Sequence, residues 1–262
     1  MHHSDFVHLH LHTEYSLLDG ANSLDALIKK AIDLRMPAIA VTDHGNLFGA
    51  LDFYLKATKA GIKPIIGCEM YVAPGSRFDK TGAAGQYDES FFHLILLAKN
   101  KQGYKNLSIL SSAGFKDGFY YKPRIDKEIL REFHEGLIGM SACLSGEVPR
   151  LLLQGRYEDA KKAALEYREI LGLDNFYFEL QDNGIPEQEI ANRELIRLYW
   201  DIGREIAERQ EQAAQLVDHT VQGDPRGGGD VRDAPAADDD PEDAHVPRAE
   251  GDARADAGQD QP

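Results

Sequence analysis

Short apolar runs alternate with amphipathic stretches through the first 180 residues, and this alternation limits the possible folds more than any other feature of the chain. Six runs have the length and composition of strands: 6–12, 38–42, 64–72, 93–98, 137–142 and 176–180. Five stretches have helical periodicity: 24–34, 47–60, 106–114, 127–134 and 157–171. Strands separated by helices in this way predict βαβ units and a parallel sheet.

Punctuating residues support these boundaries. Ser23 stands where a helix N-cap is expected, and Gly61 and Gly172 stand where helix C-caps are expected. Six strands fit either an open doubly wound sheet or most of a (β/α) barrel, and periodicity alone does not separate the two. The polar, Gly-rich stretch 73–90 is expected to form a loop that covers or borders a site.

The C-terminal part of the chain has a different character. Residues 187–217 predict one long polar helix, broken only by Gly203. Residues 223–262 contain no Phe, Tyr, Trp, Leu or Ile, and we predict an acidic, disordered, low-complexity tail. This tail holds twelve Asp or Glu against four Arg, so it carries −8 of the net charge of −15. The remainder is only mildly acidic.

Several classes of protein are excluded by composition. No apolar run approaches the length of a membrane span, and the N-terminus lacks the basic start and apolar run of a signal peptide. Two cysteines, Cys68 and Cys143, cannot form a disulfide framework, which predicts a reducing cytoplasm. The net negative charge argues against a general nucleic-acid binder. Phosphate-binding P-loop, dinucleotide and serine-hydrolase motifs are absent.

The strongest local signal is HLHLHTEYSLLDG, residues 8–20. Alternate residues of a strand share a face, so His8, His10 and His12 are expected to point the same way. One strand histidine is usually a packing or surface residue, but three at a period of two indicate metal binding. Asp19, in the turn that follows, is placed to add a carboxylate.

Further candidate ligands lie at the ends of other expected strands. Asp43 and His44 form an Asp-His-Gly turn after one strand, although a capping Asp beside an exposed His would look the same. Glu69 lies near the end of the next strand, and charged residues are rarely buried in strands without a partner. Cys143 closes a later strand, where it is either a thiolate ligand or an inert buried thiol.

His93 fits this pattern poorly, because it opens its strand instead of closing it. Ligands drawn from five or six separate strand ends indicate a site for two or three clustered metals, not one structural zinc with close cysteine pairs. Clustered metals suit phosphoester hydrolysis, in which one generates hydroxide and the pair holds the attacking and leaving oxygens.

Longer motifs carry a specific resemblance. The segments are HLHLHTEYSLLDGA, AVTDHGNLFGALDFY, GIKPIIGCEMYVAPG, HLILLAKNKQGYKNLSILSSAG, GFYYKPRIDKEIL and GLIGMSACLSGEVPRLLL. Together, from Phe6 to Arg197, they resemble the N-terminal PHP (polymerase and histidinol phosphatase) domain of bacterial DNA polymerase III alpha subunits. The resemblance implies a PHP domain over residues 5–197, folded as a distorted (β/α)7 TIM-like barrel.

The resemblance also implies a ligand set for two or three divalent metals, whether Zn, Mn, Mg or Fe. The implied ligands are His10, His12, Asp19, His44, Glu69, His93 and Cys143. His8 becomes a neighbour of the site, and Asp43 would orient a ligand. Some members of the family have metal-dependent 3′–5′ exonuclease activity, and in others the domain is a scaffold. DNA and other replicase subunits are the implied partners.

The chain departs from the family after about Leu198. Members of the family continue into a seventh strand and an Asp-x-His motif that supplies the last two ligands, then into a DNA-directed DNA polymerase core. Here residues 198–222 are expected to form a divergent helix, and YWDIGREIAERQEQ resembles a helical segment of a restriction-like nuclease family. Asp218, His219 and His245 lack the context of ligands. An incomplete barrel is therefore expected.

Three hypotheses remain open at this point. The chain is a metal-dependent phosphoesterase or 3′–5′ exonuclease domain, impaired by truncation; a non-catalytic structural module of the polymerase; or an inactive truncated or frameshifted product.

Overall fold

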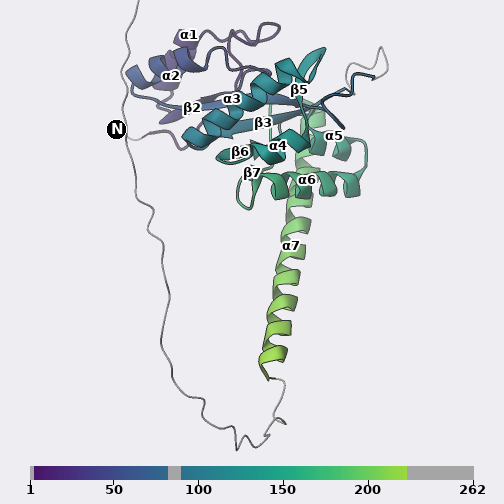
Figure 1. Cartoon of the computed structure of the whole chain (residues 1–262). Coiled ribbons are helices and arrows are strands. Elements are labelled where there is room, and N and C mark those ends of the chain that lie inside the picture. Colours follow the sequence, from purple (N-terminus) through teal and green to yellow (C-terminus); the bar gives the residue numbers. More distant parts are fainter. Residues whose placement is uncertain (1–2, 82–89, 223–262) are drawn as a thin grey trace, which may run out of the picture. The chain divides into compact units, whose positions relative to one another are not determined.

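The computed structural model describes residues 3–81 and 90–222 (Figure 1). The helices are α1 (Leu24–Asp33), α2 (Ala50–Lys59), α3 (Lys101–Lys116), α4 (Lys127–Glu132), α5 (Glu147–Leu153), α6 (Tyr157–Leu171) and α7 (Pro186–Gln222). The strands are β1 (Ala38–Val41), β2 (Lys63–Val72), β3 (Phe92–Ala98), β4 (Phe119–Tyr120), β5 (Lys122–Ile125), β6 (Leu137–Met140) and β7 (Phe176–Tyr177). One compact unit extends to Gln212 and contains all of these strands.

One mixed sheet forms the centre of the unit. Its strands follow the order β4-β5-β2-β3-β6-β7, and β1 also pairs with β2. The long strand β2 pairs in parallel with β1 along its first half and with β5 at its last residues. β6 and β7 are parallel as well. The expected α/β class is therefore found, with helices packed around a sheet (Figure 1).

The expected parallel arrangement is interrupted at β3. This strand runs antiparallel to both of its neighbours, β2 and β6. The first residues of β3 therefore pair with the last residues of β2, and bridges join the segments that follow β1 and β6 to the same end of the sheet, His44 with Glu69 and His93 with Gly146. This reversal explains why His93 opens its strand although His44 and Cys143 follow the ends of theirs.

The two faces of the sheet bury different clusters. Cys68, Met70 and Val72 alternate onto one face, where they pack with residues of β3, α3, α4 and α6. Ile95 and Leu97 alternate onto the opposite face with residues of β1 and β6. Glu69 lies between Cys68 and Met70 in β2, so its side chain belongs to this second face. A charged residue is thus placed on a face whose buried neighbours in β3 include the apolar Ile95 and Leu97.

Local sequence accounts for several of the helix ends. Ser23 caps α1, where its hydroxyl accepts a hydrogen bond from the Ala26 amide at 3.4 Å. Asn100 and Asp126 cap α3 and α4 in the same way. At the other ends, Gly61 and Gly172 adopt positive φ values of 76° and 89°, as expected of glycines that terminate helices.

Other predictions need correction. Residues 6–12 do not form a strand, and in this segment only the His8 and Leu11 carbonyls accept hydrogen bonds from the backbone of β1 and the residue after it. The expected strand 176–180 is reduced to Phe176–Tyr177. The helix expected at 47–60 begins at Ala50, and that expected at 106–114 covers Lys101–Lys116. The strands β4 and β5 and the short helix α5 were not predicted.

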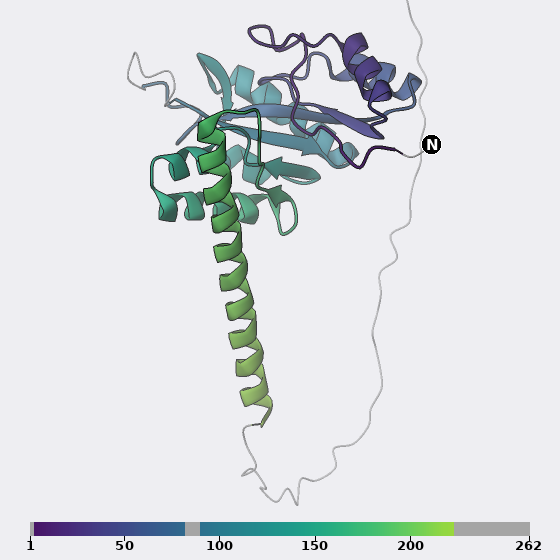
Figure 2. The ribbon, with the colours of Figure 1, turned by 180° about the vertical axis from the view of Figure 1, so that it is seen from behind.

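Helix α7 does not break at Gly203, contrary to the prediction. Its first turns pack against α5 and α6, where Leu195 and Leu198 are buried beside Val148 and Ala163 (Figure 2, in green). The helix also runs through the domain boundary expected after Arg197. The predicted disordered tail, 223–262, and residues 82–89 of the predicted loop 73–90 lie outside the described residues. No described helix combines the length and apolar character needed to cross a membrane.

Candidate metal centre

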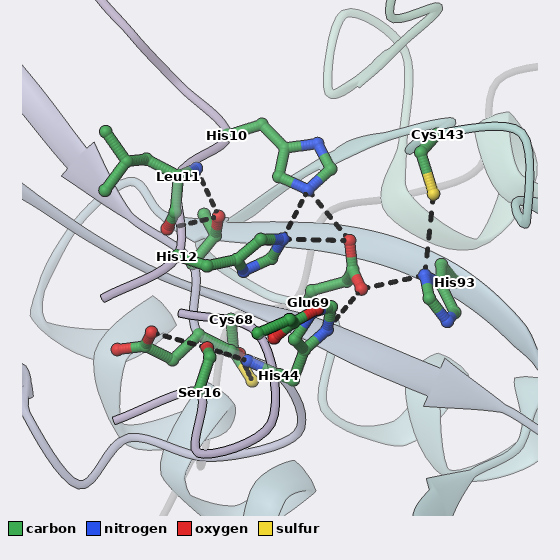
Figure 3. A network of polar contacts seen from close by, with 12 residues as sticks. His10, Leu11, His12, Ser16, His44, Cys68, Glu69, His93 and Cys143 are labelled. Atoms are coloured by element: carbon green, nitrogen blue, oxygen red, sulfur yellow. Dashed lines mark hydrogen bonds and ion pairs between the residues drawn. The ribbon is translucent and has the colours of Figure 1, made fainter. Parts of the chain in front are cut away.

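Glu69 is the centre of the candidate site (Figure 3). Its side chain is only 1% exposed, and its two carboxylate oxygens face different histidines. Oε2 lies 2.8 Å from His10 Nε2 and 3.7 Å from His12 Nε2. Oε1 lies 2.6 Å from His44 Nδ1 and 2.7 Å from His93 Nδ1. Four imidazoles from three segments therefore converge on one buried carboxylate.

His44 reaches Glu69 because of the turn that follows β1. A bridge pairs His44 with Glu69 in parallel, and the Gly45 amide donates to the Glu69 carbonyl at 2.8 Å. Gly45 has φ +64°, and a Cβ there would lie 2.8 Å from Pro123 Cγ, so the turn requires glycine. On its other side, His44 Nε2 is 3.0 Å from Asp19 Oδ2. The Asp-His-Gly turn is thus built to present His44.

His93 and Cys143 approach from the antiparallel strand and its neighbour. In the register of β2 and β3, Ile95 is opposite Glu69 and His93 is opposite Tyr71. His93 is therefore a diagonal neighbour of Glu69 on the same face, within reach of a long side chain. Cys143, after β6, places its Sγ 3.5 Å from His93 Nδ1. Its thiol is half-buried and free.

The N-terminal segment supplies His10 and His12 but not His8. The Nε2 atoms of His10 and His12 are 3.2 Å apart and point toward the same oxygen of Glu69. His8 is exposed, and its ring packs edge-on against Phe6 instead. The expectation of three histidines on one face fails because the segment is not a regular strand.

Glu179 is a neighbour of the site that the sequence reasoning missed. It follows β7, and its Oε1 lies 2.6 Å from His10 Nδ1, the ring nitrogen that faces away from Glu69. Gln181 Nε2 donates to the same oxygen at 2.7 Å. A carboxylate near the end of an expected strand was the signal that led to Glu69, and the same signal was present at Glu179 in the expected strand 176–180.

The electrostatics of the cluster are those of mutually compensating charges. Burial alone would raise the pKa of Glu69, but hydrogen bonds from His10, His44 and His93 hold it well below its usual range. Burial lowers the pKa of His10, but Glu179 and Glu69 outweigh this and raise it to about 10. Burial also lowers the pKa of His93, but its contacts with Cys143 and Glu69 outweigh this effect and raise the pKa to about 9. For His12, burial dominates and the pKa is lowered.

Asp43 does not reach the cluster directly. It is buried, and its carboxylate accepts hydrogen bonds from the Thr13 amide at 2.7 Å, the Thr13 hydroxyl at 2.8 Å and the Ser16 hydroxyl at 2.7 Å. The Ser16 oxygen in turn accepts a hydrogen bond from the His44 amide at 3.1 Å. Asp43 therefore fixes the turn between His12 and Asp19 against the start of the Asp-His-Gly turn.

The donor set fits metal ions. Two groups have ligand atoms within 4.8 Å of one another: His10, His12 and Glu69, and Glu69, His93 and Cys143. Imidazole, carboxylate and thiolate are the ligand types of zinc and related transition metals. Within the described residues, the buried side-chain atoms without a well-aligned hydrogen bond include His12 Nδ1, His44 Nδ1 and Glu69 Oε1, as well as Glu179 Oε2 and the distant Arg77 Nε. Around Glu69, such atoms favour ligation over a hydrogen-bonded structural cluster.

A large cavity adjoins the cluster on the face of the sheet that carries Glu69. Its volume is about 1640 Å³, and His10 and Glu179 lie in its wall together with the apolar side chains of Ile65, Ile138 and Met140. The cavity therefore leaves space beside His10, between apolar side chains of the sheet and the polar cluster.

Comparisons with known protein families and with individual proteins both match the N-terminal part of this chain. A family profile described as "PHP domain" matches residues 8–183. DNA polymerase III subunit alpha of Treponema pallidum is 47% identical over 220 residues, which are 81% of this chain and 19% of that protein. The same subunit of Borreliella burgdorferi is 52% identical over 200 residues, 76% of this chain and 17% of that protein. The chain thus spans about a fifth of the length of these relatives.

A solved structure described as a metal-dependent phosphoesterase of Bifidobacterium adolescentis is 13% identical, with a TM-score of 0.44, and covers 75% of this chain and 85% of that one. So distant a likeness carries no weight for the chemistry of the site.

Proposed function

This chain belongs to the PHP domain family, as its motifs indicated, and we propose that it carries the metal-dependent phosphoesterase-type site of a DNA polymerase III alpha subunit. The observation that supports this proposal is the convergence of four imidazoles on the buried Glu69 carboxylate. No packing requirement explains such a cluster, because burying one charged carboxylate with several imidazoles costs desolvation that simple apolar residues would avoid.

In the proposed site, each oxygen of the Glu69 carboxylate would bind a different metal ion. His10 and His12 would hold an ion with Oε2, and His93 and Cys143 would hold a second ion with Oε1. His44 and Asp19 lie between them, 3.0 Å apart, and complete the seven proposed ligands. When bound, divalent ions of this kind lower the pKa of water and polarise a phosphoester. These residues would hold the ions, and Asp43 keeps the turn that carries Asp19 in place.

We further propose that hydrolysis is impaired in this chain. The family resemblance implies two more ligands from an Asp-x-His motif, and the cavity beside His10 leaves that side of the cluster uncovered. The alternative is a non-catalytic structural module, which the same uncovered cavity favours. DNA and other replicase subunits are the partners we propose through the parent polymerase, and the cytoplasm is the proposed location.

Metal content and hydrolysis together test the proposal. Mass spectrometry of protein dialysed against Zn²⁺ or Mn²⁺ should find bound metal below full occupancy of three ions. Release of nucleotides from a 3′-recessed oligonucleotide and hydrolysis of a chromogenic phosphate ester should be slow or absent. In His12→Ala, bound metal should fall further, whereas His8→Ala should match the wild type. Three tightly bound ions with turnover abolished by His12→Ala would contradict impairment, and no bound metal would contradict the metal site itself.

A further inference from the structure

His10 differs from the other histidines of the cluster because carboxylates occupy both sides of its ring. Nε2 points toward Glu69 Oε2 at 2.8 Å, on the side of His12. Nδ1 points toward Glu179 Oε1 at 2.6 Å, on the opposite side. The ring is only 11% exposed, so water has little access to replace either partner.

The position of the proton on His10 follows from the partner of Nδ1. A carboxylate only accepts hydrogen bonds, so the short contact with Glu179 requires a proton on Nδ1. The Gln181 amide nitrogen, 3.3 Å from Nδ1, makes its shorter contact with Glu179 Oε1 and so leaves Nδ1 free to donate to that oxygen. In the metal-free structure Nε2 also faces a carboxylate, at 2.8 Å, so the same argument places a proton on each ring nitrogen. An ion bound at Nε2 would take the place of the Nε2 proton, and the neutral ring would keep the proton on Nδ1 that it donates to Glu179.

Glu179 is itself held in place from several directions. Its amide donates to Ser141 Oγ at 2.9 Å, next to the end of β6. Its Oε1 accepts from Gln181 Nε2 at 2.7 Å, and Gln181 Oε1 accepts from Gln188 Nε2 at 3.1 Å. Gln188 is buried in the first turn of α7. A chain of three side chains therefore connects the start of α7 to His10.

A direct metal-binding role for Glu179 fits the geometry less well. Its carboxylate lies on the Nδ1 side of His10, whereas Glu69 and His12 lie on the Nε2 side. Glu179 also belongs to neither of the two described groups whose ligand atoms lie within 4.8 Å of one another. Its contact with the site is made through the ring of His10.

We propose that Glu179 is a positioning residue that holds His10 in the tautomer and orientation in which Nε2 binds metal, and that Gln181 fixes Glu179 for this task. The inference rests on the proposed metal site. Carboxylates placed behind a metal-binding histidine in this way raise the basicity of the ligand and orient its ring, and their loss weakens metal binding by roughly 10–100-fold.

Zn²⁺ affinity of the 262-residue chain, measured by competition with a chromophoric chelator, tests the proposal. Glu179→Gln should weaken Zn²⁺ binding by roughly 10–100-fold. Asp182→Asn makes the same chemical change three residues away on an exposed side chain, and its affinity should equal that of the wild type. Melting of the metal-free proteins checks that the variants fold. Glu179→Asp, whose shorter side chain retracts the carboxylate from Nδ1, should also bind Zn²⁺ more weakly and serves if the glutamine variant does not fold.

Nitrogen NMR of ¹⁵N-histidine-labelled, Zn²⁺-loaded protein adds a signature that a purely structural role would not give. In the wild type and in Asp182→Asn, His10 should show a protonated Nδ1 and a metal-bound Nε2, and Glu179→Gln should lose the strongly hydrogen-bonded Nδ1 proton. Wild-type affinity in Glu179→Gln or Glu179→Asp, or coordination through Nδ1, would overturn the role of Glu179 and leave the metal site standing. Failure of the wild type to bind Zn²⁺ would overturn both.

Discussion

Replacing Asp43 by alanine should destabilise the fold strongly and loosen the site, although Asp43 touches none of the proposed ligand side chains. The change removes the acceptor of three buried hydrogen bonds, from the Thr13 amide, the Thr13 hydroxyl and the Ser16 hydroxyl. A hydrogen bond to a charged acceptor contributes about 1.5–3 kcal/mol, so the lower end of that range gives a loss of about 4–5 kcal/mol. For a unit of this size, the melting temperature should fall by roughly 8–20 °C.

Urea unfolding followed by far-UV circular dichroism measures this loss. Asp43→Asn keeps one acceptor oxygen for the Thr13 amide and Ser16, so its cost should be smaller, about 1–2 kcal/mol. Asp33→Ala is a matched control, because Asp33 is exposed and pairs with Lys29 along α1; its cost should stay within about 0.5 kcal/mol. An Asp43→Ala protein within about 1 kcal/mol of the wild type, at an unchanged slope against urea, would refute the reasoning.

The remaining predictions concern the site, a charge pair and the helix. Glu69→Gln should abolish Zn²⁺ binding by both proposed groups, which metal analysis after dialysis would show; retention of one ion would argue against a shared carboxylate. Burial raises the pKa of Glu166, but Lys127 and Arg131 outweigh it and lower that pKa. The ion pairs of Glu166 with Lys127 and Arg131 therefore stabilise the fold at pH values above the unfolded pKa of about 4.5, and this stabilisation is lost as the pH falls through the lower folded pKa. The urea midpoints of the wild type and of Glu166→Gln should therefore converge in acid. Leu198→Ala should cost about 2–5 kcal/mol and exposed Trp200→Ala little, and equal midpoints would contradict the packing of α7.

Hydrophobic periodicity and capping residues were enough to predict the elements whose ends are set by residues near in sequence. The helix expected at 157–171 was found with those limits, because its apolar residues keep one face and Gly172 ends it with a positive φ. The strand ends that carry His44 and Glu69 were also close to their expected positions. In these segments, residues near in sequence decide both the element and its end.

Strand direction is different, because the alternation of a strand is the same in both directions. The direction of β3 depends on the connection before it. A parallel return needs a crossover of a dozen or more residues, usually a helix, whereas an antiparallel return needs only a turn. Residues 73–90 show no helical periodicity. The absence of a crossover helix before β3 therefore favours an antiparallel β3, and an antiparallel β3 places His93 beside Glu69.

Contacts between distant segments had no such signal. Glu179 and His10 are 169 residues apart in the chain, and their contact depends on the pairing of β6 with β7 and on the irregular path of residues 6–12. That path is held beside β1 by hydrogen bonds to carbonyls three residues apart, His8 and Leu11, a spacing that a regular strand does not produce. The periodicity argument therefore found the histidines but placed one too many in the site.

Glu69 shows why the two sides of the proposed centre cannot be independent. Its Oε2 contacts the histidines of the N-terminal segment, and its Oε1 contacts His44 and His93. The carboxylate group is rigid and planar, so a rotation that improves one oxygen's geometry moves the other. A substitution on the N-terminal side, at His10 or at the Glu179 behind it, should consequently shift the Glu69 carboxylate and alter its contact with His93. The proposed ions are thus coupled by one side chain on β2, the strand that also joins β1, β3 and β5.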